Sequence, residues 1–264
     1  MAPQPIETFH YGQGEVLAAR RTSAAEPPPN AWKKLWDVSA LSLALAPTAF
    51  THKESRTGGK YDVREIETGR SGTCTATLRA INTHNLALLM WAEESIQGGG
   101  TVTDEPFPSD TAAGDIVMLD YLGIEDLEIT DSAGSPVTIA PTHYDSSSLV
   151  YGTLPILTLP TSPAPTPPLL ASFTHAGARQ VGILATKKPE IALRYNGINL
   201  AEDGAPVVLD LWRMSTGALS ELALINNGEE VAGMPFTGTL LADLTKPAGP
   251  LGYFGRIAYV GDGS

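Results

Sequence analysis

Alternation of apolar with small or polar side chains is the feature that most constrains the fold of this chain. It is clearest at residues 36–45 and 206–214. A period of two places every second side chain on the same side of a strand. The 26 glycines and 21 prolines among 264 residues suit many short strands joined by turns. We therefore expect a mainly β fold.

Proline, glycine and polar residues indicate where the expected strands end. Pro47 should end the first long strand, and the polar residues 51–60 should form an exposed loop. We expect strands at 61–67 and 73–81, joined by a hairpin turn at Gly69–Gly72. Further strands are expected at 190–195, 206–214, 229–232 and 234–242. A helical turn is expected at 217–222.

One short helix is expected near residues 85–91. Asn82 or Thr83 can cap its first turn, and Leu86, Leu89 and Met90 fall on one face. A helix this short requires packing against a sheet.

The chain divides into three expected parts. Residues 1–113 and 179–264 form one interrupted domain, and residues 114–178 form a β-rich insert. In the insert, residues 131–135 should turn a hairpin, and the proline-rich residues 158–168 should form a stiff extended loop.

Sequence motifs predict no catalytic, cofactor-binding or metal site. The five histidines lack ligand spacing, and no nucleophile elbow, phosphate-binding loop or dinucleotide fingerprint occurs. Asp126, Glu128 and Asp131 could chelate calcium in a loop, but the EF-hand spacing is absent. Cys74, the single cysteine, is expected to be a small buried residue. These observations favour a structural or binding role over an enzyme, although catalytic residues can assemble from distant positions.

With a net charge of −12, the chain is not expected to bind nucleic acid strongly through its phosphates, because such binding needs clustered Lys and Arg. A negatively charged surface around DNA would repel its phosphates and leave the DNA mobile. The alternative explanation of the negative charge is that it keeps the protein soluble. No apolar run approaches the length of a membrane span, so no membrane insertion is expected. The first residues lack the pattern of a signal peptide, which predicts a protein made and kept in the cytoplasm or released by lysis.

Several segments together resemble the major tail tube proteins of long-tailed, siphovirus-like bacteriophages. The similar segments cover much of both ends of the chain, and residues 140–180 depart most from the pattern. They are residues 11–18 (YGQGEVLA), 36–45 (WDVSALSLAL), 52–58 (HKESRTG), 73–78 (TCTATL), 85–89 (NLALL), 195–204 (YNGINLAEDG), 220–225 (SELALI) and 236–243 (FTGTLLAD).

The resemblance implies a β-sandwich or barrel with one short helix, six copies of which close into a ring. Rings would stack into a tube through which the genome passes without specific binding. An inter-ring stacking loop is expected within residues 48–62, with His52, Lys53, Glu54, Ser55 and Arg56 as its polar contacts. Glu65, Glu67 and Asp210 are candidate carboxylates facing the channel. The insert is expected on the tube exterior.

The partners implied are further copies of the chain and the tail tip or baseplate, tape measure and tail terminator proteins. The expected location is the virion tail, assembled in the host bacterial cytoplasm. Three alternatives remain open. They are a secretion-system tube protein, a β-sandwich module that binds sugars or host surfaces, and an esterase or glycosidase, which turnover on a broad panel of substrates would reveal.

Overall fold

The computed structural model describes residues 9–21, 27, 29–228 and 231–260. The chain forms two compact units: unit 1 comprises residues 1–93 and 181–264, and unit 2 comprises residues 94–180. The expected insert lies within unit 2, but unit 2 begins at Glu94 rather than at residue 114. The reason is that Gly100–Pro106 pairs with Leu170–His175, which draws the earlier segment into the inserted unit.

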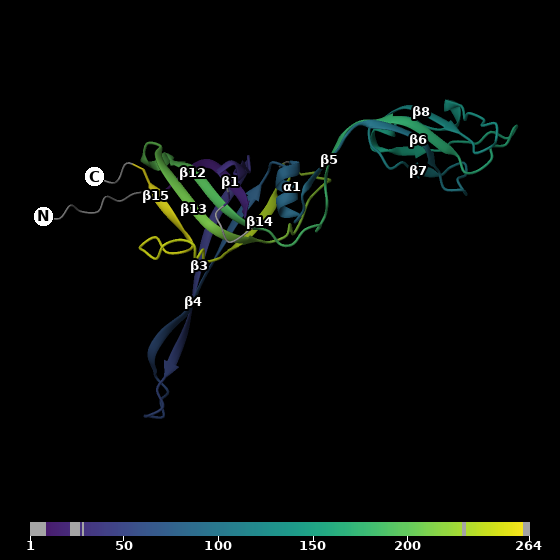
Figure 1. Cartoon of the computed structure of the whole chain (residues 1–264). Coiled ribbons are helices and arrows are strands. Elements are labelled where there is room, and N and C mark those ends of the chain that lie inside the picture. Colours follow the sequence, from purple (N-terminus) through teal and green to yellow (C-terminus); the bar gives the residue numbers. More distant parts are fainter. Residues whose placement is uncertain (1–8, 22–26, 28, 229–230, 261–264) are drawn as a thin grey trace. The chain divides into compact units, whose positions relative to one another are not determined.

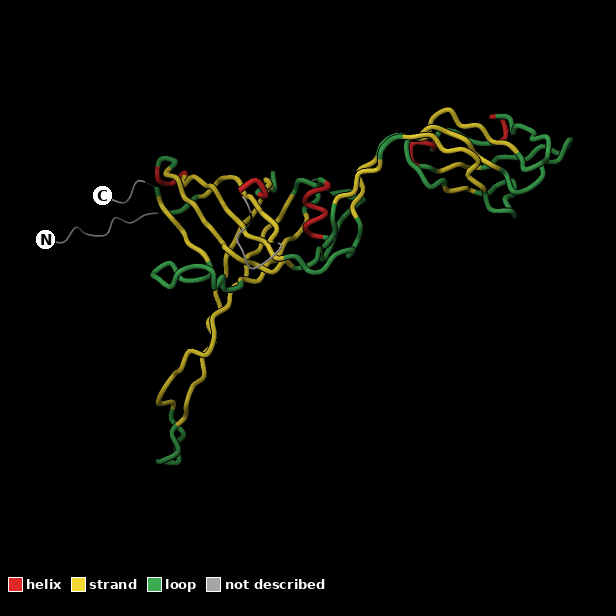
Figure 2. Tube along the Cα trace, viewed as in Figure 1, coloured by secondary structure: helices red, strands yellow, loops and turns green. Residues whose placement is uncertain are grey.

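The expectation of a mainly β fold is confirmed (Figures 1 and 2). Unit 1 contains an eight-stranded antiparallel sheet with the order β2-β1-β12-β13-β14-β4-β3, and β15 also pairs with β13. The strands are β1 (Gly12–Arg21), β2 (Lys33–Lys34), β3 (Val38–Lys53), β4 (Asp62–Leu78), β12 (Glu190–Asn199), β13 (Ala205–Thr216), β14 (Met234–Leu240) and β15 (Gly255–Tyr259).

The sheet of unit 1 packs one side on a single apolar core. β4 and β14 contribute alternate residues to it, with Cys74, Leu78 and Phe236 almost completely buried. Leu193 and Leu211, which are in register on β12 and β13, continue the same core. On β13 the period-two pattern of the sequence places Val207, Leu209 and Leu211 on one side, and Leu209 and Leu211 do contact this core.

β3 and β4 form one long hairpin, which overturns two expected strand limits. β3 continues through Pro47 because it is an edge strand, where a missing N–H group is tolerated. β4 likewise continues through residues 69–72 instead of turning. Gly72 is buried there, and a Cβ atom on it would lie 2.8 Å from Leu240 Cδ1 and 3.0 Å from the Ala44 carbonyl oxygen. Gly72 therefore serves close packing rather than a turn.

The expected helix is α1 (Thr83–Leu89), and the Asn82 side chain caps it by accepting a hydrogen bond from the Asn85 N–H at 2.9 Å. The helical turn expected at residues 217–222 is absent. The backbone bonds elsewhere instead: Gly217 N–H donates to Thr237 and Leu219 N–H donates to Leu89.

The strand expected at residues 229–232 is not found over its described part, residues 231–232. Residues 229–230 lie outside the described residues. Regular pairing begins at Met234, where β14 meets β4.

Unit 2 contains short antiparallel strands around its own core. The elements are β6 (Gly100–Pro106), β10 (Leu170–His175) and β8 (Ile124–Thr130) in one sheet, β7 (Ile116–Met118) with β9 (Thr153–Pro155), and the ribbon of β5 (Glu94–Gln97) with β11 (Ala178–Val181). Phe107, Ile129, Leu154 and Phe173 fill the core. The expected hairpin around residues 131–135 is reduced to β8 and one isolated bridge from Thr130 to Thr138.

Asp131 binds the backbone of the proline-rich loop of unit 2, residues 158–168. Its buried carboxylate accepts hydrogen bonds from the N–H groups of Val137 at 2.7 Å and Thr166 at 2.9 Å. These backbone hydrogen bonds, that of Thr166 first, lower the pKa of Asp131. The carboxylate therefore serves the loop, which disfavours the calcium role considered for it.

Candidate functional site

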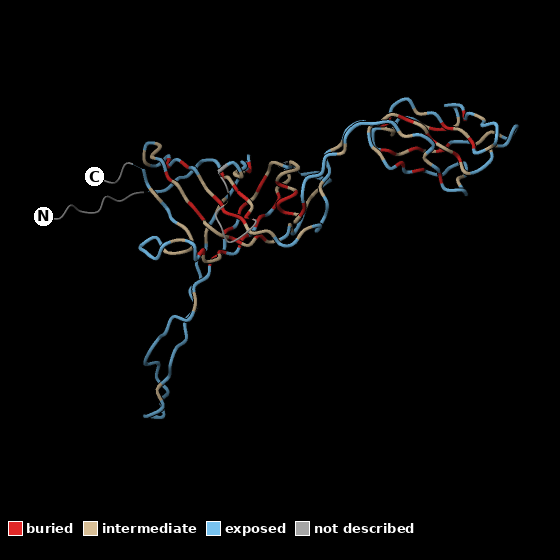
Figure 3. The backbone as a smooth tube through the Cα atoms, in the orientation of Figure 1, coloured by how far each residue is buried: buried red, intermediate tan, exposed pale blue. Residues whose placement is uncertain are grey.

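The distal part of the β3–β4 hairpin is the most exposed regular structure of unit 1. From Asp62 to Gly72, β4 pairs only with β3 among the described strands. Phe50 and Ile66, which are in register, are 57% and 44% exposed, and Tyr61 and Val63 lie nearby and are also exposed. Figure 3 shows the hairpin as an exposed tube extending from the buried sheet. A two-stranded hairpin is at best marginally stable alone in water, so the distal part of the hairpin depends on its continuity with the sheet for its stability.

The residues expected to make stacking contacts lie at the far end of this hairpin. They are His52, Lys53, Glu54, Ser55 and Arg56, and only some of them make contacts within the turn. Lys53 pairs with Asp62 at 2.7 Å. The Glu54 carboxylate accepts hydrogen bonds from the Thr57 hydroxyl and the Arg56 N–H, which lower its pKa in that order. Lys53 and Glu54 therefore shape the turn, whereas His52, Ser55 and Arg56 lie exposed.

Asp210 does not match its expected role as a carboxylate facing a channel. It is only 7% exposed. Its carboxylate lies 2.9 Å from Arg256 Nε and 3.3 Å from Arg194 Nη1. Cross-strand pairing places both arginines opposite it, so its charge is already balanced.

Glu65 and Glu67 lie on the distal hairpin rather than on the body of the sheet. Glu67 pairs with Arg70, and the Arg70 hydrogen bond and charge lower the pKa of Glu67. Glu67 also borders a hollow with Leu45 and Phe254. Glu65 is exposed and faces Thr51 in the register.

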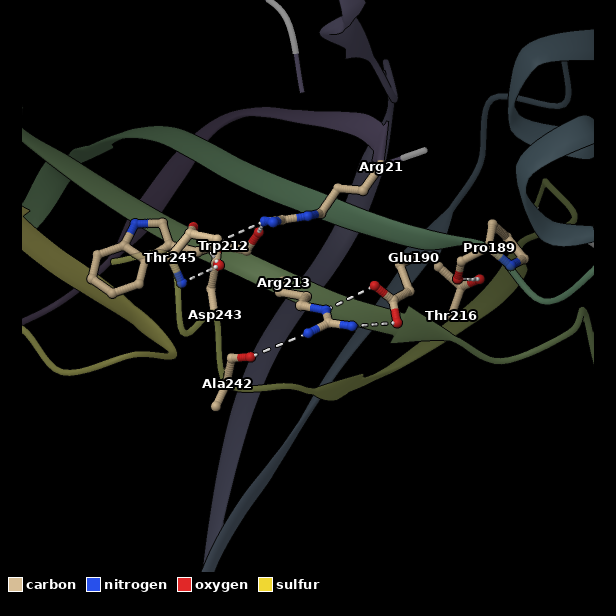
Figure 4. Close-up of polar contacts among 9 residues, drawn as sticks. All are labelled: Arg21, Pro189, Glu190, Trp212, Arg213, Thr216, Ala242, Asp243 and Thr245. Atoms are coloured by element: carbon tan, nitrogen blue, oxygen red, sulfur yellow. Dashed lines mark hydrogen bonds and ion pairs between the residues drawn. The ribbon is translucent and has the colours of Figure 1, made fainter. Parts of the chain in front are cut away.

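Buried and half-buried ion pairs hold the end of β13 to its neighbours (Figure 4). Arg21 Nη1 lies 2.7 Å from Asp243 Oδ2, and both side chains are 1% exposed. Arg213 binds Glu190 through Nε at 2.7 Å and Nη2 at 2.9 Å. These contacts join β1, β12, β13 and the segment after β14, so we assign them to the fold.

Over residues 40–46 of β3, 71–77 of β4 and 235–239 of β14, the side opposite the core carries hydroxyl and methyl groups and no charge. The register aligns six hydroxyl side chains on it: Ser42, Thr73, Thr75, Thr77, Thr237 and Thr239. We call this surface the hydroxyl face. Ala40 and Ala44 lie between these residues, and Ala46, Ser71 and Pro235 extend the face. The expectations drawn from the sequence missed this surface, although the alternating threonines of residues 73–77 are a visible signal for it.

The negative charge of the chain is concentrated in unit 2. Residues 94–180 contain eleven acidic residues and one basic residue, a net charge of −10. The remaining residues have a net charge of −2. The overall acidity therefore says little about the surfaces of unit 1.

Two strand edges of unit 1 have little or no pairing and border the same groove. β3 pairs only with β4 among the described strands, and β1 meets β2 only at Leu17 and Ala18. The groove between these edges has a volume of about 860 Å³. None of the described residues that line it is an Asp, Glu, Lys or Arg. Unpaired edges next to an uncharged groove are typical of a surface that another strand or chain covers.

Metal-binding groups and the single thiol are two chemical features to locate in the described part of the chain. No group of three or more His, Cys, Asp and Glu side chains is placed to hold a metal ion there. Burial raises the pKa of Cys74 to about 11, so its thiol is unreactive near neutral pH. None of the described helices is long and apolar enough to cross a membrane.

The fold and these surfaces define a mainly antiparallel β protein of two units, with a protruding hairpin and open sheet edges. The chain belongs to the family described as "Protein of unknown function UCP028589", whose model matches residues 9–258. A search of curated proteins found no match.

Proposed function

We propose that this protein is the structural subunit of a bacteriophage tail tube. Six copies close into a ring, and rings stack around a channel for DNA. The observation that carries the proposal is the β3–β4 hairpin, which extends from unit 1 with its apolar residues exposed. The resemblance of the sequence to major tail tube proteins supports the same conclusion.

The open edge of β3 supports closure into a ring. An exposed strand edge presents unpaired N–H and C=O groups, which promote uncontrolled association. β3 leaves a 16-residue edge with no other strand along it among the described residues. Pairing such an edge with the next copy in a closed ring satisfies these groups and limits growth.

The hairpin joins one ring to the next in this proposal. His52, Ser55 and Arg56 at its far end supply polar contacts, and Phe50 and Ile66 supply apolar area. Complete burial of an aromatic or branched aliphatic side chain contributes about 1.5–3 kcal/mol. Phe50 and Ile66 are 57% and 44% exposed, so burying the rest of both side chains contributes about 1.5–3 kcal/mol per hairpin to stacking.

The hydroxyl face lines the channel in this proposal, in place of the carboxylates expected from the sequence. DNA is gripped through its phosphates by Lys and Arg, and the hydroxyl face carries neither. DNA would therefore pass along it without being held.

Unit 2 lies on the tube exterior. Its net charge of −10 keeps such a surface soluble. Because β5 and β11 pair antiparallel, residues 98–177 can be replaced by a short turn joining the two strands. This variant should still form rings, and loss of all assembly would contradict an exterior, dispensable unit 2.

The other proposed partners are the tail tip or baseplate, tape measure and tail terminator proteins, and the proposed location is the virion tail. A secretion-system tube protein would share the ring architecture. A sugar-binding or host-surface-binding module is the alternative from another class. One observation favours it for unit 2: Tyr151 is 73% exposed beside the exposed Val150. Binding of isolated polysaccharides that is lost in Tyr151→Ala would support that alternative.

Negative-stain electron microscopy of the concentrated protein tests the tube proposal. We expect hollow rings and tubes. A variant with residues 49–67 replaced by a short turn should give rings that do not stack. Sonicated fragments of tubes formed by the same protein can be added to nucleate assembly. Protein that stays monomeric even after this addition would contradict the proposal.

A further inference from the structure

The groove between β1 and β3 presents backbone and apolar groups together. Gly12, Gln13 and Gly14 lie along one side of it, and residues 38–43 of β3 lie along the other. Leu209, Ile257 and other apolar residues of β13 and β15 form part of the lining. A strand or hairpin fits such a site because edges offer hydrogen bonds and the lining accepts apolar side chains.

The distal hairpin has the matching properties. It is extended, its outer edges are unpaired among the described strands, and Phe50, Val63 and Ile66 are exposed. It belongs to the same chain, so every copy carries both the groove and the hairpin. A contact between two different surfaces of identical chains is heterologous, and it repeats from copy to copy.

Charge supports this pairing. Residues 52–64 contain four basic and two acidic residues, a net charge of +2 in a chain of −12. One end of the groove lies at Tyr11, whose carbonyl oxygen accepts a hydrogen bond from Leu200 N–H. Leu200 begins the short 3-10 helix η4 (Leu200–Glu202), so Glu202 and the exposed Asp203 lie at this end of the groove. The whole distal hairpin, residues 49–67, has four basic and four acidic residues and is neutral, so the attraction to the negative groove end belongs to its basic end, residues 52–64.

We infer that the groove between β1 and β3 receives the distal β3–β4 hairpin of a second copy of this chain. The occupant adds hydrogen bonds along the Gly12–Gly14 part of the β1 edge, because the β3 edge pairs with a neighbour in the ring. It buries Phe50 and Ile66 against the apolar lining and brings its basic end to Glu202 and Asp203. This inference rests on the proposed function, because it identifies the surface that receives the stacking hairpin.

Cross-linking between single-cysteine variants tests the contact directly. The native thiol, Cys74, is buried with its pKa raised to about 11, and it therefore gives little background reaction. Thr51→Cys places a thiol on the hairpin, and Gln13→Cys places one in the groove. Ser146→Cys on unit 2, also an exposed position, is the matched control. The variants are mixed in pairs under assembly conditions, oxidised, and separated on a non-reducing gel.

We expect a dimer band from Thr51→Cys mixed with Gln13→Cys, at least tenfold stronger than from Thr51→Cys mixed with Ser146→Cys. The band should disappear when the hairpin variant also carries Phe50→Ser. Equal bands from both mixtures, or no band from the groove mixture, would overturn the inference.

Electron microscopy of the same samples separates this inference from the proposed function. Tubes without the groove cross-link would leave the tube function standing and refute the docking site. A groove cross-link without tubes would support the docking site and refute the tube function. Absence of both would refute both.

Discussion

The buried ion pair between Arg21 and Asp243 gives a prediction with a defined magnitude. Burial alone would raise the pKa of Asp243, but hydrogen bonds from Arg21 and Thr245 and the Arg21 charge lower it overall. Asp243→Asn keeps the shape of the side chain and removes the carboxylate charge beside Arg21. Removing one partner of a buried pair costs about 3–5 kcal/mol. For a unit of this size, that cost corresponds to a loss of roughly 6–20 °C in Tm.

Urea unfolding of Asp243→Asn beside a matched control measures this cost. Asp62→Asn removes a carboxylate at the same short distance from a cation, Lys53, but both side chains there are about 60% exposed. An exposed pair contributes about 0–1 kcal/mol. Equal destabilisation by the two substitutions at neutral pH would refute the reasoning.

The pH dependence of this difference follows from the direction of the pKa shift. The folded-state pKa of Asp243 is lowered, so its stabilisation is complete above the unfolded value of about 3.9. That stabilisation is lost as the pH falls through the folded-state pKa. The difference in free energy of unfolding between the native chain and Asp243→Asn should therefore shrink in acid. A difference that grows below pH 4 would contradict this assignment.

Three further changes test other parts of the account. Phe50→Ser should change the unfolding free energy by less than about 0.5 kcal/mol. It should weaken each stacking contact roughly 4- to 20-fold, because the 57% of the side chain that is exposed would be buried on stacking, as sedimentation would measure. Unchanged assembly would show that the hairpin is not a contact. Thr75→Lys should make assembled tubes retain duplex DNA at low salt and release it at high salt, whereas Thr75→Gln should not, as co-sedimentation would show. Asn82→Ala should cost about 1 kcal/mol by removing the cap of α1, as thermal unfolding would measure, and no change would show that the observed cap contributes nothing.

Local chemistry made part of this fold predictable. The helix cap and the alternation in β13 are decided by neighbouring residues. The sequence predicted the alternation and a cap at Asn82 or Thr83, and the structure has the cap at Asn82. The strand limits expected at Pro47 and Gly72 were wrong because the roles of these residues depend on distant partners. Pro47 is tolerated on a sheet edge, and Gly72 makes room for Leu240.

The candidate surfaces were less predictable than the strands. Asp210 was expected to face a channel, but its environment depends on Arg194 and Arg256 from two other strands. The division into units depends on pairing between residues about 70 positions apart, β6 with β10, which the local pattern does not reveal. The net charge of the chain was a poor guide to the charge of each surface. It is a sum over all residues and does not show that most of the negative charge lies in unit 2.

Cryo-electron microscopy of the assembled protein tests the central claim most directly. We predict a tube of stacked six-membered rings in which β3 of each copy pairs with a neighbouring copy and Thr75 and Thr237 face a hollow channel. A reconstruction without a channel, or one in which the edge of β3 and the distal hairpin contact only solvent, would contradict the account.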